Sequence, residues 1–220
     1  MMRSHLFADG EFYHVYNRGV DKRWTFADNS DRKRFLRGMY LFREKERTRG
    51  IPISKQSLRR AIQDPLVRIH HFSLMPNHYH FLLEQTGEQG VSKFMQRLGN
   101  GYTQYFNKRH DRSGSLFQSS YQVKHVDNDT YFLELSRYIS LNCLDIWYPN
   151  WKKMGFQNPR EALRRLRTFF WASYPAYSID GSCLHLAKDK TRSFFEGKET
   201  FQDHVEKGVE QVLLSDSGRF

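Results

Sequence analysis

The sequence predicts an α+β fold in which helices pack on an antiparallel β-sheet. Two observations support this fold class. Stretches with strand-like composition alternate along the chain with stretches whose apolar residues recur at helical spacing. Two strand-like stretches are also separated only by Met75, Pro76 and Asn77. Because proline cannot donate a ladder hydrogen bond, this separation indicates a tight hairpin.

Each expected element has its own pattern. The strand-like stretches are rich in β-branched and aromatic residues, and their expected bounds are Glu11–Val20, Leu66–Leu74, His78–Glu84 and Ser115–Val126. The helical stretches have apolar residues three or four apart, and their expected bounds are Asn29–Arg47, Gly90–His110 and Asp127–Ile146. Ser30 or Asp31 can cap the first helix, and Asp127 or Asp129 the third.

The chain divides into a core of residues 1–157 and a C-terminal extension of residues 158–220 that packs on or beside the core. The extension begins with a basic amphipathic stretch, PREALRRLRTFF, and a final helix is expected within FFEGKETFQDHVEKGVEQVLL. No internal repeat or low-complexity tract is apparent.

The composition favours a nucleic-acid partner. Lys and Arg number 35 against 24 Asp and Glu, so the net charge is +11, and aromatic residues make up 15%. Positive charge interleaved with aromatic rings suits a polyanion whose bases can stack, although a solvated basic surface is the simpler alternative. The N-terminus is too short and polar for a signal peptide, and no stretch predicts a membrane span. Cys143 and Cys183 form no disulfide or metal pattern, so we expect a cytoplasmic protein.

Two histidines flank one tyrosine in the stretch MPNHYHFLLE. Side chains alternate along a strand, so His78 and His80 would share one face, with Cα atoms about 7 Å apart. Both imidazoles could then reach one divalent ion in an open site, whereas a closed zinc site would need further Cys or Asp ligands. The alternative is a chance pair in a chain with 10 histidines.

Tyr138 and Asn142 are four residues apart on an expected helix and therefore share one face. Tyrosine is a possible nucleophile, and an asparagine oxygen is a possible metal ligand. An aromatic residue at helical spacing is more often part of a core, and the spacing leaves both interpretations open.

Taken in order, these stretches resemble a known family. The pair His78 and His80 after MPN, followed by RYISLN, is similar to the single-tyrosine HUH transposases, and most similar to their REP-associated branch. YHVYNRG, GSLFQSSYQ and WASYPAY agree with that branch, and the resemblance spans roughly residues 10–178. It implies a ferredoxin-like or RRM-like nuclease core plus a helical extension.

The resemblance implies a metal-dependent endonuclease and strand transferase that nicks single-stranded DNA near hairpin repeats. His78 and His80 would hold Mg²⁺ or Mn²⁺, and Asn142 would complete the ligand set. Tyr138 would form a 5′-phosphotyrosine intermediate that allows strands to be rejoined without ATP. The chain departs from the family after Asn142, where Cys143 and Leu144 replace a usual Pro-Val, and around Phe117. Both departures bear on target sequence and cleavage efficiency.

Six basic residues are candidates for contacts with DNA phosphates, although each could also be a surface charge. They are Arg18, Arg97, Lys108, Arg109, Arg112 and Lys124. The REP-associated branch and the long tail favour a monomer, whereas other relatives are dimers. A second hypothesis is a non-catalytic or degenerate protein that binds hairpin nucleic acid, in the manner of an RNA-recognition module. A structural zinc protein is disfavoured because ligands are missing.

Overall fold

The computed structural model describes residues 7–45, 61–178, 186–195 and 199–211. Four strands form one sheet in the order β2-β3-β1-β4, with every pair antiparallel. Their bounds are β1 Phe12–Arg18, β2 Val67–Met75, β3 His78–Gln85 and β4 Gln122–Val126. The predicted α+β fold with a central hairpin is confirmed, and the order is that of a ferredoxin-like sheet.

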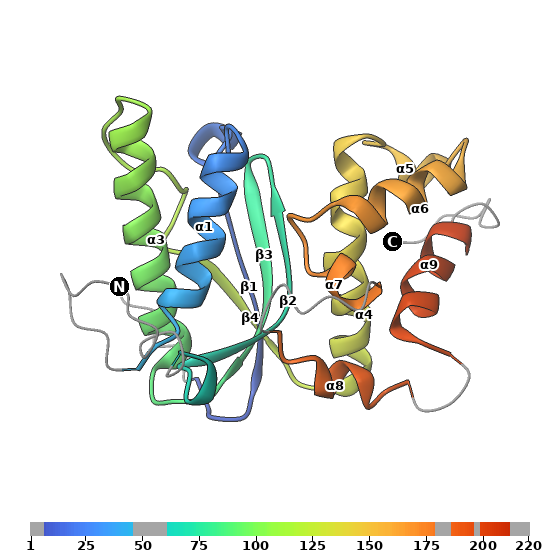
Figure 1. Cartoon of the computed structure of the whole chain (residues 1–220), viewed down its shortest axis with the longest axis horizontal. Helices are drawn as coiled ribbons and strands as arrows, with labels where there is room; N and C mark the ends of the chain where they lie inside the picture. Colours follow the sequence, from blue (N-terminus) through green and yellow to red (C-terminus); the bar gives the residue numbers. More distant parts are fainter. Residues whose placement is uncertain (1–6, 46–60, 179–185, 196–198, 212–220) are drawn as a thin grey trace.

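Helices cover both faces of this sheet (Figure 1). One face carries α1 (Asn29–Leu41) and α3 (Gly90–Arg109), and the other carries α4 (Asp129–Leu141). Beyond α4 lie short or C-terminal helices: η2 Asn142–Ile146, α5 Trp151–Met154, α6 Pro159–Thr168, α7 Tyr174–Ser178, α8 Lys188–Arg192 and α9 Phe201–Gln211. Among the described residues, no helix is long and apolar enough to cross a bilayer.

The alternation of side chains separates an apolar face from a polar one. Tyr13, Val15 and Phe81 belong to the core cluster that also contains residues of α1 and α3. Their neighbours in sequence point the other way, as the alternation predicted. His14, Tyr16 and the two histidines of β3 therefore gather beneath α4.

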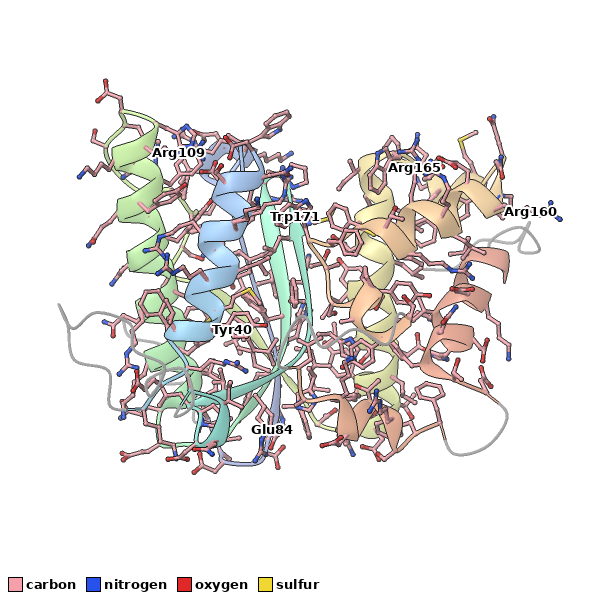
Figure 2. The ribbon with its side chains drawn as sticks, in the orientation of Figure 1. Tyr40, Glu84, Arg109, Arg160, Arg165 and Trp171 are labelled. Atoms are coloured by element: carbon pink, nitrogen blue, oxygen red, sulfur yellow. The ribbon has the colours of Figure 1, made fainter. Side chains whose placement is uncertain are left out.

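The helix caps differ from the sequence-based expectation. Asp28 caps α1, because its carboxylate accepts from the N–H groups of Ser30 and Asp31. Asp31 is instead fully buried and pairs with Arg109 at the end of α3, 2.6 Å away. Figure 2 shows Arg109 at this end of α3, close to α1. Asn128 caps α4, where Asp127 or Asp129 was expected.

Three expected elements are too long. The first helix ends at Leu41 rather than Arg47, and β4 begins at Gln122 rather than Ser115. Leu116 and Phe117 are buried against the sheet, but only an isolated bridge joins Phe117 to Gly19. The α-helix that carries Tyr138 stops at Leu141 and continues as a 3₁₀-helix.

The C-terminal extension lies along the free edge of β2 and against α4. The N–H of Leu74 donates to Trp171 O at 2.9 Å, and the N–H of Ser173 donates to Phe72 O at 2.9 Å. Val205 and Val209 of α9 share a cluster with Leu141 at the end of α4. The extension thus covers an edge that would otherwise be open to pairing with another chain. The division at residue 157 stays a prediction.

We expect acid to weaken the packing of the extension at His71, which lies on β2 away from the histidine pair. Its ring is fully buried, bonds Thr191 Oγ1 of α8 at 2.9 Å and stacks on Tyr177. Burial lowers the pKa of His71 well below its ordinary value of 6.5. The unfolded chain therefore binds more protons below about pH 6.5, so this contribution is present above that pH and lost as the pH falls.

Urea unfolding of the metal-free protein between pH 7 and pH 4 checks this expectation. The wild type should lose stability on acidification, and His71→Phe should reduce the slope without removing it, because other buried histidines contribute in the same direction. An unchanged slope in the variant would contradict the assignment to His71.

Candidate active site

The site lies where the β2–β3 turn meets the C-terminal end of α4 (Figure 1). The register of β1 and β3 sets Arg18 opposite His78 and Tyr16 opposite His80. These four strand side chains lie on the face of the sheet that α4 covers, where His78 contacts Asn142 and His80 contacts Tyr138. The structure therefore brings together the histidine pair and the helix residues that the sequence predicted separately.

Asn77 determines which nitrogen of His78 carries the proton. Its amide Nδ2 donates to the carbonyl of Lys22 at 3.1 Å, so its Oδ1 faces Nδ1 of His78 at 2.6 Å. An oxygen at that position can only accept, and Nδ1 of His78 must therefore be the protonated nitrogen. In a neutral ring this leaves the Nε2 lone pair free, as metal ligation requires.

That lone pair points at a second acceptor. Oδ1 of Asn142 lies 3.2 Å from Nε2 of His78. Two acceptors facing each other repel unless a cation lies between them, and adjacent ligands of an octahedral Mg²⁺ are about 3.0 Å apart. Among the described residues no group of three or more His, Cys, Asp or Glu could hold a metal, so a site here would use two imidazoles and this amide. These residues fit a divalent cation in an open site.

His14 is a residue of the site that the sequence analysis did not identify. Its Nε2 lies 2.9 Å from Nδ1 of His80, and the two rings stack. If Nδ1 of His80 donates this hydrogen bond, Nε2 of His80 carries no proton and can bind a cation. If Nε2 of His14 donates instead, the neutral His80 ring carries its proton on Nε2 and cannot bind a cation there. His14 in its Nδ1–H form thus makes His80 a competent ligand. The alternation that placed Tyr13 in the core could have placed His14 on the histidine face.

All three imidazoles are held neutral at pH 7. Burial lowers the pKa of His78 and of His14 to about 4, and that of His80 to about 2. Neighbouring positive charges act in the same direction, namely Lys124 on His14 and Arg18 on His78 and His80. Neutral imidazole is the form that binds metal.

Tyr138, the predicted nucleophile, is accessible to solvent. Its side chain is 40% exposed, and its ring centroid lies 5.5 Å from that of His80. Partial burial, followed by the charge of Asp145, raises its pKa above 10, whereas Arg18 and Asn142 oppose that rise. The phenol is therefore protonated at neutral pH and must lose its proton before or during attack. Lys152 of α5 lies 5.4 Å from the ring centroid and adds positive charge.

The six predicted DNA contacts occupy different environments. Arg18 is exposed beside the site, and Lys124 is exposed on β4 near His14. Lys108 is exposed at the end of α3, away from the histidines. The other three make internal bonds: Arg97 to Glu44 O, Arg109 to Asp28 and Asp31, and Arg112 to Ser115 O. Contact with DNA stays a prediction for all six.

Part of the sequence and the overall fold are similar to known proteins. Residues 41–142 match the family model described as transposase IS200 like. The similarity to this family therefore covers a little less than half of the chain. A solved structure of a REP-associated tyrosine transposase bound to a REP hairpin is similar in fold, with 9% identity and a TM-score of 0.53. The similarity covers 81% of this chain and 85% of that one. No curated protein matches the chain significantly.

The segment that matches the family model ends at Asn142. It includes the histidine pair and Tyr138 but not His14, which β1 contributes from outside the segment. The helices after α4 also lie outside it, including those that pack against the tyrosine helix.

Proposed function

We propose that this protein is an IS200-like transposase that nicks and rejoins single-stranded DNA beside a hairpin through a covalent bond to Tyr138. The observation that carries the proposal is the convergence of two side chains, Tyr138 of α4 and Asn142 directly after α4, on His78 and His80 of β3. Tyr138 is exposed at that point, and Oδ1 of Asn142 lies 3.2 Å from Nε2 of His78, which suits a cation shared by the two. The solved relative bound to a REP hairpin supports a hairpin substrate.

In the proposed reaction, Oη of Tyr138 attacks the scissile phosphorus, and the bond from phosphorus to the 3′ oxygen breaks. The phenol releases its proton, and the departing oxygen takes one up to leave a free 3′-OH. The 5′ end stays on Tyr138 as a phosphodiester, so attack by a 3′-OH reverses the step and joins strands.

The surrounding residues prepare this step. Mg²⁺ or Mn²⁺ held by His78, His80 and Asn142 would polarise the scissile phosphate. Asn77 orients His78, and His14 orients His80. The positive charge of Arg18 favours both the phenolate of Tyr138 and a bound phosphate.

Metal removal tests the proposal directly. The protein is incubated with a labelled pool of oligonucleotides that carry a hairpin stem beside a randomised single-stranded tract, with Mn²⁺ or with EDTA. A denaturing protein gel should show a covalent DNA adduct with Mn²⁺ and none with EDTA. An adduct of equal yield in EDTA would contradict a metal-dependent step. Binding without any adduct would favour the degenerate hairpin binder.

A further inference from the structure

The side chain of Trp24 is unusually exposed to solvent. Its side chain is 65% exposed, whereas Trp151 is 6% exposed and the other two tryptophans are partly buried. A single exposed apolar side chain is common on protein surfaces and proves nothing by itself. The loop that holds Trp24 makes this one informative.

The loop of residues 19–25 has an energetically unfavourable backbone conformation that hydrogen bonds hold in place. Asp21 and Lys22 both have left-handed backbones, with φ of 55° and 58°, and such a conformation costs about 1–2 kcal/mol for a residue other than glycine. On either side of Trp24 the loop is tied to the β2–β3 turn, because Gly19 N–H donates to Asn77 O and Thr25 N–H donates to Pro76 O, each at 2.8 Å. Backbone outliers held in this way are common at functional sites.

The close packing also explains the glycine of the YNRG stretch. Gly19 has an ordinary φ of −62°, so handedness does not require a glycine there. A Cβ at this position would instead lie 2.3 Å from the carbonyl oxygen of Arg23. The loop therefore folds back onto Gly19 and turns Trp24 outward.

The same loop is linked directly to the proposed site. The amide of Asn77 bonds Lys22 O on one side and His78 Nδ1 on the other, so two hydrogen bonds connect the loop with the first histidine. Arg18 precedes the loop, and its charge acts on His78, His80 and Tyr138. Within the described part of the chain, neither Arg18 nor Lys22 has an ion-pair partner. An exposed indole and two cations thus lie on or beside a loop that is hydrogen-bonded to the turn before His78.

We propose that Trp24 stacks on an unpaired base of the strand that enters the site, while Lys22 and Arg18 contact its phosphates. The inference rests on the proposed function and adds a base-binding position to it. Aromatic stacking combined with nearby cations is the way in which proteins hold single strands without reading sequence, and one stacked base contributes about 1–3 kcal/mol. An indole stacks with any base, so this contact would hold the strand and leave target selection to other residues.

The test measures binding in EDTA, so that no cleavage is needed. Both probes carry the same hairpin stem beside a 20-nucleotide single-stranded tract. The tract is oligo-dT in one probe, and in the other every base of the tract is replaced by an abasic tetrahydrofuran. Trp24→Ala should weaken binding of oligo-dT about 10-fold and leave binding of the abasic strand unchanged. Trp24→Phe should restore most of the affinity, and Phe170→Ala, which removes another exposed aromatic ring, is the matched control.

The outcomes separate the two proposals. If the wild type binds neither strand, the proposed function fails. If it binds oligo-dT and Trp24→Ala binds equally well, the stacking position is wrong, and the indole serves another partner. Equal losses on both strands would also overturn it, because Trp24 would then act through the backbone or the fold. Quenching of tryptophan fluorescence by oligo-dT, absent in Trp24→Ala, is the expected independent sign.

Discussion

Phenylalanine in place of Tyr138 should reduce formation of the covalent adduct by about 10³-fold or more, because the variant lacks the attacking oxygen. The side chain is 40% exposed, and the substitution removes one hydroxyl group. The fold, the metal ligands and the affinity for the hairpin oligonucleotides should therefore be nearly unchanged. The adduct gel with Mn²⁺ and a binding titration in EDTA measure the two properties separately.

Tyr16 provides a matched control for this prediction. Its ring stacks on His80 with the centroids 5.7 Å apart, so it is a second tyrosine at the same histidine. Tyr16→Phe should still form the adduct, since the variant keeps Tyr138, and Tyr16 lies on β1 rather than on α4. An adduct that survives in Tyr138→Phe and disappears in Tyr16→Phe would show that the wrong tyrosine has been chosen.

Removing the ring nitrogens of His14 should weaken metal binding by about 10- to 100-fold, the usual cost of losing a group that orients a ligand. His14→Phe keeps a planar ring in the stack with His80. It removes the acceptor for Nδ1 of His80, so the proton of that ring is no longer confined to Nδ1. The fraction of His80 with a free Nε2 should then fall.

Free Mn²⁺ measured by electron paramagnetic resonance during a titration gives this affinity without any turnover. His125→Phe is the control, because His125 lies on the neighbouring strand β4 and pairs with Glu11 at the surface. The control should bind Mn²⁺ like the wild type. Equal affinity in His14→Phe and the wild type would mean that His80 does not depend on His14.

Local patterns in the sequence determined much of the fold. The alternation in Glu11–Val20 and in His78–Glu84 correctly separated an apolar face from a histidine face, because side chains of an extended chain must alternate. The stretch Met75–Asn77 indicated the hairpin, whose turn is Pro76 and Asn77, and helical spacing indicated α1, α3 and α4. The ends of elements were less predictable. Asp28 and Asp31 are both able to cap a helix, and only their tertiary contacts distinguish them, since Asp28 caps α1 whereas Asp31 is buried and pairs with Arg109.

The sequence also singled out His78, His80, Tyr138 and Asn142, whose types and spacings carry chemical meaning within one strand or one helix. Only the tertiary structure decided what each of them faces. The ring nitrogens of His78 and His80 are oriented by Asn77 and His14, and the latter is 66 residues from its partner in sequence. The loop that carries Trp24 reaches the site only through bonds to a turn more than 50 residues away. Hydrogen bonds and burial between distant segments depend on how the strands pair, and no local pattern encodes that pairing.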